Sequence, residues 1–209
     1  MGVGKSRIVA HSNREIEHKL QTTNPTFDLP KTNGEISFND AFGHVGHIFI
    51  DFSRGDQYSD CEKDLDTSTS LGLRIAAHFF FGVGFDALMD KLLDMEQRKQ
   101  FTFGNVCSLI SKRYVTNKQV LLTIQFDEFQ KLPKEERKEN DIVNKIISLL
   151  GTHVTSEHDL GVCILAQLTG TDTIVEIKEI DNSRLIPTLL LLEPLETGQE
   201  IKLCQIELG

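Results

Sequence analysis

The sequence predicts an α/β protein with a mainly parallel sheet that is covered by helices on both faces. Strand-like apolar runs alternate with helical stripes along the chain, which is the pattern of a parallel sheet with crossover helices. The strand-like runs are almost continuously apolar, as in strands that are buried on both faces. The 209 residues are enough for one well-buried domain and few for two, so we expect a single domain over residues 1–209.

The first half of the chain is expected to hold three helices and one strand. Ser6–Leu20 follows two glycines and predicts a helix, and Gln21–Gly46 is polar with several Pro and Gly, which predicts a loop with at most a short turn of helix. His47–Phe52 is β-branched and aromatic and ends in a polar turn, which predicts a strand. Leu71–Phe81 is an apolar helix candidate, and Phe85–Arg98 follows a 3.6-residue period and predicts a second helix.

The second half of the chain continues the alternation. A short helix is expected around Val106–Ile110, and a longer helical stripe from Ile142 to Leu150 is closed by Gly151, a residue that suits a helix C-cap. Three apolar segments, Val120–Phe126, Leu160–Leu168 and Leu185–Leu192, are predicted as strands, and Thr173–Ile180 alternates like a half-exposed strand.

Composition and charge narrow the function classes. Acidic residues number 31 and basic residues 22, so the net charge is −9 and direct nucleic-acid binding is not expected. The four cysteines form no C-x-x-C pair, which is typical of a reduced, intracellular protein of the cytoplasm or nucleus. No apolar run approaches the roughly eighteen residues of a membrane helix, and no secretory signal follows the first residues, so no membrane partner is expected.

The first motif that carries chemistry is Gly2-Val3-Gly4-Lys5-Ser6, followed by Arg7. It matches the second half of the phosphate-binding pattern G-x-x-x-x-G-K-[ST], called Walker A. In that pattern backbone N–H groups and a helix N-terminus hold phosphates, the Lys reaches the β and γ oxygens, and the Ser binds Mg²⁺. The motif precedes a helix candidate, which favours this interpretation.

The first glycine of the pattern and the strand that delivers it would both lie before Met1. We therefore expect either a chain clipped at its start or a degenerate copy of the site. Because the missing strand would lie in the middle of the sheet, we expect the chain as written to hydrolyse ATP poorly and an extended version to do so well.

The second motif is the strand Leu121–Phe126, which ends in the two carboxylates of Asp127 and Glu128. At the C-terminal edge of a parallel sheet the first carboxylate can bind Mg²⁺ and the second can polarise the attacking water, which is the Walker B arrangement. The alternative is that both carboxylates cap the turn that follows. A third feature is Thr169, which ends the next strand where a sensor residue would touch the γ-phosphate, although an ordinary Thr-Gly turn explains it equally well.

Four segments together give a family resemblance. They are Gly-Val-Gly-Lys-Ser (2–6), Leu-Gly-Leu-Arg (71–74), Phe-Asp-Glu-Phe-Gln (126–130), and Leu-Thr-Gly-Thr (168–171) before Leu-Leu-Glu-Pro-Leu (191–195). This chain resembles the P-loop NTPase domain of Crinkler-type effectors and of trypanosomatid retrotransposon hot spot proteins, which are related to AAA and STAND ATPases. The resemblance implies a three-layer P-loop NTPase-like fold, whose phosphate-loop strand is missing here, in a multi-domain protein that often has a separate nuclease-like or kinase-like effector domain. The sequence shows neither that domain nor a lid, so we expect a copy that is truncated at both ends. A true effector of this kind would be secreted to a host cell.

The resemblance implies an Mg²⁺-dependent ATPase whose partners are a nucleotide and either other proteins or further copies of itself. Glu128 would be catalytic; Gly2, Val3, Gly4, Lys5, Ser6, Arg7 and Thr169 would bind nucleotide; Ser6 and Asp127 would bind the metal. The alternative is a degenerate, non-catalytic interaction module with the same fold. A small-molecule kinase would need an Arg-rich lid, which the sequence does not contain.

Three weaker signals come from histidines and an arginine. His44 and His47 lie three residues apart, but no third metal ligand is close in sequence, which favours a loop entering a strand over a metal site. Arg74 lies inside an apolar segment, where it either has a carboxylate or phosphate partner or extends its charged end to solvent. His78 is expected to belong to the core or its rim. Finally, the topology of such ATPases predicts that the Val120–Phe126 strand neighbours the His47–Phe52 strand.

Overall fold

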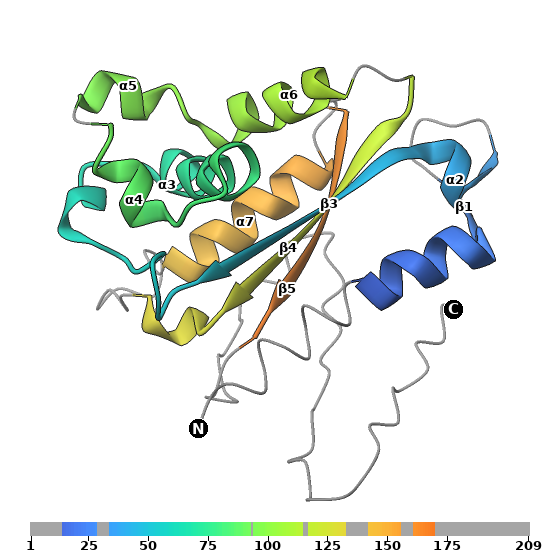
Figure 1. Cartoon of the computed structure of the whole chain (residues 1–209), viewed down its shortest axis with the longest axis horizontal. Helices are drawn as coiled ribbons and strands as arrows, with labels where there is room; N and C mark the ends of the chain where they lie inside the picture. The colour runs from blue at the N-terminus through green and yellow to red at the C-terminus, as the bar shows by residue number, and fades with distance from the viewer. Residues whose placement is uncertain are drawn as a thin grey trace, which may run out of the picture.

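The computed structural model describes residues 14–28, 34–92, 94–114, 117–132, 142–155 and 161–169 (Figure 1). Within these ranges the protein is a mixed α/β structure built on a parallel sheet, so the predicted class is confirmed at that level. In this part of the chain no helix has both the length and the hydrophobicity of a membrane span.

The sheet has three parallel strands in the order β3-β4-β5. β3 is Phe42–Asp51, β4 is Gln119–Asp127 and β5 is Val162–Leu168. The predicted neighbours are confirmed, because β4 pairs in parallel with β3 on one side and with β5 on the other. β4 is the central strand and is buried over all but its first residue, which explains its mainly apolar sequence.

Three helices cover the first face of the sheet. They are α3 (Thr67–Ala76), α6 (Phe103–Arg113) and α7 (Ile142–Thr155), and Figure 1 shows them together on one side of the strands. Alternate strand residues point into this core and are, among others, Ile48, Ile50, Leu122, Ile124, Phe126 and Val162. The same alternation sends the intervening residues to the second face.

The second face carries a helix over residues 14–23, drawn in blue in Figure 1 and here called helix 14–23. Its Ile16 and Leu20 lie against Val45, Leu121 and Leu165 of the three strands. The sheet is therefore covered on both faces within the described residues, as predicted. The predicted helix began at Ser6, but residues 1–13 lie outside the described ranges, and its observed end lies three residues beyond the predicted one.

The prediction of a loop over Gln21–Gly46 is wrong. β1 (Thr26–Asp28) pairs antiparallel with β2 (Glu35–Ser37), and the short α2 (Phe38–Ala41) leads directly into β3. The side chain of Ser37 caps α2 by accepting from the backbone N–H of Asp40. The elements are short and interrupted by Pro and Gly, so no periodicity marked them.

Two helix predictions also need correction. The segment Phe85–Arg98 holds two short helices, α4 (Phe85–Met89) and α5 (Met95–Lys99), because the Asp94 side chain caps a new helix by accepting from the N–H of Glu96. Gly151 does not end α7, which continues to Thr155.

The predicted helix over Leu71–Phe81 is present but begins earlier, and α3 passes into the π-helix η2 (Ala77–Phe81), which ends at Gly82 with φ 63°. Short 3-10 turns are η1 (Asp60–Glu62) and η3 (Phe129–Lys131). The predicted strands Thr173–Ile180 and Leu185–Leu192 lie outside the described residues.

Candidate functional site at the carboxyl edge of the sheet

The carboxyl ends of the three strands bring together two carboxylates and a hydroxyl. Asp51 and Asp127 are register partners at the ends of β3 and β4, so their side chains project to the same face. Thr169 immediately follows β5, and its hydroxyl donates to Asp127 Oδ1 over 2.7 Å. The structure thus joins Asp127 and Thr169, two of the residues predicted from the sequence.

Asp127 is held in a defined position. Its side chain is buried, with 6% of the residue exposed, and its backbone C=O accepts from the N–H of Phe52 over 3.1 Å. Thr169 is fixed in turn, because its N–H donates to the carbonyl of Phe126 over 2.8 Å. A carboxylate that accepts a hydrogen bond in such a buried setting is oriented rather than mobile.

Glu128 departs from ordinary backbone geometry. Its φ of 54° and ψ of 36° lie in the left-handed region, which costs a non-glycine residue about 1–2 kcal/mol. This conformation turns the chain out of β4 and into η3, with the Glu128 side chain partly buried. Backbone strain of this kind is concentrated at functional sites, so it favours Glu128 as a candidate functional residue.

The end of β3 contributes residues that the sequence did not single out. Asp51 Oδ1 accepts from both the N–H and the hydroxyl of Ser53, over 2.8 and 2.6 Å. The buried carboxylate of Asp56 accepts from the N–H groups of Asp51 and Phe85 and lies 2.8 Å from His78 Nε2. The signal for Asp51 was present, because His47–Phe52 is an apolar strand with a carboxylate near its end, as in β4.

Arg74 has a carboxylate partner, as one of the two interpretations predicted. Its guanidinium forms a two-point ion pair with Glu62, whose side chain is fully buried, and the Nη2–Oε1 distance is 2.8 Å. The guanidinium also lies 4.0 Å from the ring centre of Phe85 and donates to the carbonyls of Asp56 and Gln57. This network fixes the loop that follows β3 at the edge of the site.

The surroundings of His44, Cys107 and Cys163 favour structural over chemical roles for these three side chains. Across these ranges there is no group of three or more His, Cys, Asp or Glu side chains that could hold a metal ion. His44 stacks on Tyr114 at 3.9 Å between ring centres, and burial lowers its pKa. Burial raises the pKa of the Cys107 thiol to about 12 and also raises that of Cys163, which makes both thiols poor nucleophiles.

Of the two predicted magnesium ligands, the described residues include Asp127, whose carboxylate oxygens are of the type that Mg²⁺ prefers. The other predicted ligand, Ser6, belongs with residues 2–7, which lie outside the described residues. Comparison of the chain with family models, with curated proteins and with solved structures finds no match.

Proposed function

We propose that this chain is a P-loop NTPase domain that binds Mg-ATP at the carboxyl edge of its parallel sheet. The observation that carries the proposal is the oriented carboxylate of Asp127 at the end of the central buried strand, held by the hydroxyl of Thr169 from the next strand. Ligands of open parallel α/β sheets bind beyond the carboxyl ends of the strands, which is where these groups lie.

The handedness of the chain supports the same site. Both described crossovers, β3 to β4 and β4 to β5, place their helices on the first face, whereas helix 14–23 lies on the second face (Figure 1). Because parallel crossovers are right-handed, a parallel strand preceding helix 14–23 would join on the β5 side of the sheet. A phosphate loop after such a strand would meet the same edge as Asp127 and Thr169.

In this proposal each residue has a distinct role. Lys5 and the backbone of Gly2–Ser6 bind the phosphates, and Arg7 adds positive charge beside them. Asp127 and Ser6 hold the metal, which when bound neutralises charge on the phosphates. Thr169 orients Asp127, and Glu128, held in its strained turn, accepts the proton of the attacking water.

The test is binding and hydrolysis of ATP by the full 209-residue chain. A fluorescent ATP analogue should bind more tightly with Mg²⁺ than without it, and Asp127→Asn should remove that difference. Glu128→Gln should keep binding, and in a version of the chain extended before Met1 it should lower phosphate release by on the order of a hundredfold or more. The matched control is Asp60→Asn, which makes the same charge change at a side chain that is 93% exposed, and it should behave as the wild type.

Two results would contradict the proposal in different ways. If the folded wild type binds no nucleotide with or without Mg²⁺, the site is not a nucleotide site. If it binds nucleotide but Glu128→Gln leaves a measurable hydrolysis rate unchanged, the assignment of the base is wrong. Binding with no turnover in the extended version would favour the non-catalytic interaction module.

A further inference from the structure

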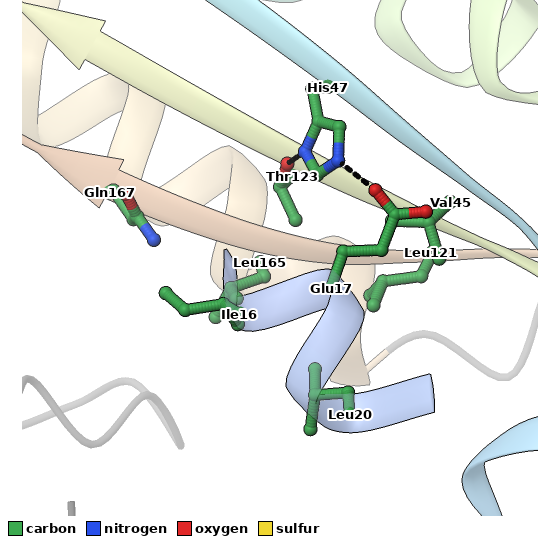
Figure 2. A pocket seen from close by; sticks show the side chains of 9 residues that line it. All are labelled: Ile16, Glu17, Leu20, Val45, His47, Leu121, Thr123, Leu165 and Gln167. Atoms are coloured by element: carbon green, nitrogen blue, oxygen red, sulfur yellow. Dashed lines mark hydrogen bonds and ion pairs between the residues drawn. The ribbon is translucent and has the colours of Figure 1, made fainter. Parts of the chain in front are cut away.

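A chain of three side chains joins helix 14–23 to the sheet. His47 of β3 has Nε2 2.6 Å from Glu17 Oε2 of the helix, and Nδ1 2.5 Å from Thr123 Oγ1 of β4 (Figure 2). The Thr123 hydroxyl also lies 3.3 Å from the carbonyl oxygen of Gly46. The three residues come from three different elements, and His47 is 30 residues from Glu17 and 76 from Thr123 in sequence.

Counting protons shows which state of His47 this geometry suits. The contacts His47–Glu17, His47–Thr123 and Thr123–Gly46 need three hydrogens if each is to be a hydrogen bond. With Glu17 ionised, a neutral imidazole and one hydroxyl supply only two, so one contact is lost or becomes a repulsion between lone pairs. A protonated imidazole donates from both ring nitrogens while Thr123 donates to Gly46, and all three contacts are satisfied.

The surroundings favour a structural role for this network over a catalytic one. The adjoining cavity, lined by residues of helix 14–23 and all three strands, has a volume of about 10 Å³, room for a single water molecule. Glu17 and His47 are each about one quarter exposed, so solvent protons reach them. Among the described residues, His44 is coupled electrostatically to both groups: burial lowers its pKa most, Glu17 raises it and His47 lowers it further. Gln167 and Leu165 of β5 complete the lining and are neutral.

We propose that Glu17, His47 and Thr123 form a pH-sensitive latch that holds helix 14–23 against the second face of the sheet while His47 is protonated. When His47 loses its proton, the imidazole keeps one N–H, so the contact with Glu17 changes from an ion pair to a hydrogen bond from a neutral donor, and one of the three hydrogen bonds is lost. The latch therefore weakens as pH rises and the imidazole loses its charge. This inference does not depend on nucleotide binding.

The experiment measures hydrogen exchange of the backbone amides of helix 14–23 in the full chain, by NMR, at pH 6 and pH 8. After correction for intrinsic exchange rates, we expect the protection factors to fall on the order of tenfold in the wild type, because a hydrogen bond from a charged donor is roughly twice as strong as one from a neutral donor. His47→Gln keeps a polar side chain but cannot titrate, so its protection factors should not change with pH. Thr123→Val removes the hydroxyl and with it two of the three contacts, so only the His47–Glu17 contact still needs a hydrogen, which a neutral imidazole can supply. The protection factors of this variant should therefore change less with pH than those of the wild type.

The control and the direct readout decide the outcome. His18→Gln removes an exposed histidine of the same helix, next in sequence to Glu17, and should keep the full pH dependence. The ¹⁵N shifts of the His47 ring should show both nitrogens protonated at pH 6. The proposal is overturned by protection that is constant with pH in the wild type, by a pH dependence that survives His47→Gln, or by a neutral His47 ring at pH 6.

Discussion

The ion pair between Arg74 and Glu62 gives the sharpest prediction about stability. The two side chains are 3% and 0% exposed, so removal of one charge leaves the other buried without a counter-charge. Glu62→Gln preserves the shape of the side chain and isolates this electrostatic effect from cavity formation. Breaking a buried pair in this way costs about 3–5 kcal/mol, and we expect the lower end because the amide oxygen of the introduced glutamine would still accept a hydrogen bond.

Urea unfolding followed by circular dichroism measures this loss. With a slope of about 2 kcal/mol per molar urea, a loss of about 3 kcal/mol lowers the midpoint by roughly 1.5 M. The double variant with Met at both Glu62 and Arg74 removes the isolated charge but leaves the carbonyls of Asp56 and Gln57 without their guanidinium donor. It should therefore recover only part of the loss.

The control is Glu96→Gln, which breaks an exposed pair with Lys99 and should leave the midpoint unchanged. A midpoint for Glu62→Gln that matches this control would refute the reasoning, because it would mean that Arg74 reaches solvent when its partner is neutral.

Three further predictions concern packing, charge and thiol reactivity. A Cβ at Gly72 would lie 2.0 Å from a backbone oxygen, so Gly72→Ala should destabilise the protein by about 3 kcal/mol in thermal unfolding. A Cβ at Gly104 would meet nothing within 4 Å, so Gly104→Ala should stabilise the protein by about 0.5–1 kcal/mol. Burial raises the pKa of Asp86, so its charged form disfavours the fold; Asp86→Asn should stabilise the protein at pH 7, and the gain should vanish as the pH falls below about 3.9, where both states hold the proton. Iodoacetamide at pH 8 should label the exposed Cys61 and spare the buried Cys107 in the native protein, as peptide mass spectrometry will show; equal labelling would mean that the core opens.

The parallel strands could be predicted because their signal is local. β4 is buried on both faces and is apolar from Val120 to Phe126 except for Thr123 and Gln125, and the hydroxyl at Thr169 follows β5 where parallel strand ends meet. The start of β3 could not be found in the same way. Its first six residues contain two glycines and two histidines, and a Cβ at Gly46 would lie in tight contact with the Phe79 ring, at 3.1 Å.

The contacts that define the site's surroundings could not be predicted because they are not local. An arginine in an apolar helix indicates that a partner exists, but Glu62 reaches Arg74 from a separate 3-10 turn. Glu17 and His47 likewise look like ordinary exposed residues until the helix and strand are packed together. The strained backbone of Glu128 lies in the turn between β4 and η3, and the residue types in this turn do not indicate a left-handed conformation.

The parallel topology also has a consequence for how the chain folds. No two strands of the β3-β4-β5 sheet can meet through a tight turn, since His47 pairs with a residue 76 positions away and Asp127 contacts one 42 positions away. The shorter loop costs about 0.5 kcal/mol less entropy to close, and its 14-residue helix α7 supplies local structure within it. We therefore expect β4, α7 and β5 to assemble first, and β3 to dock onto them in a slower step that sets the folding rate of the sheet.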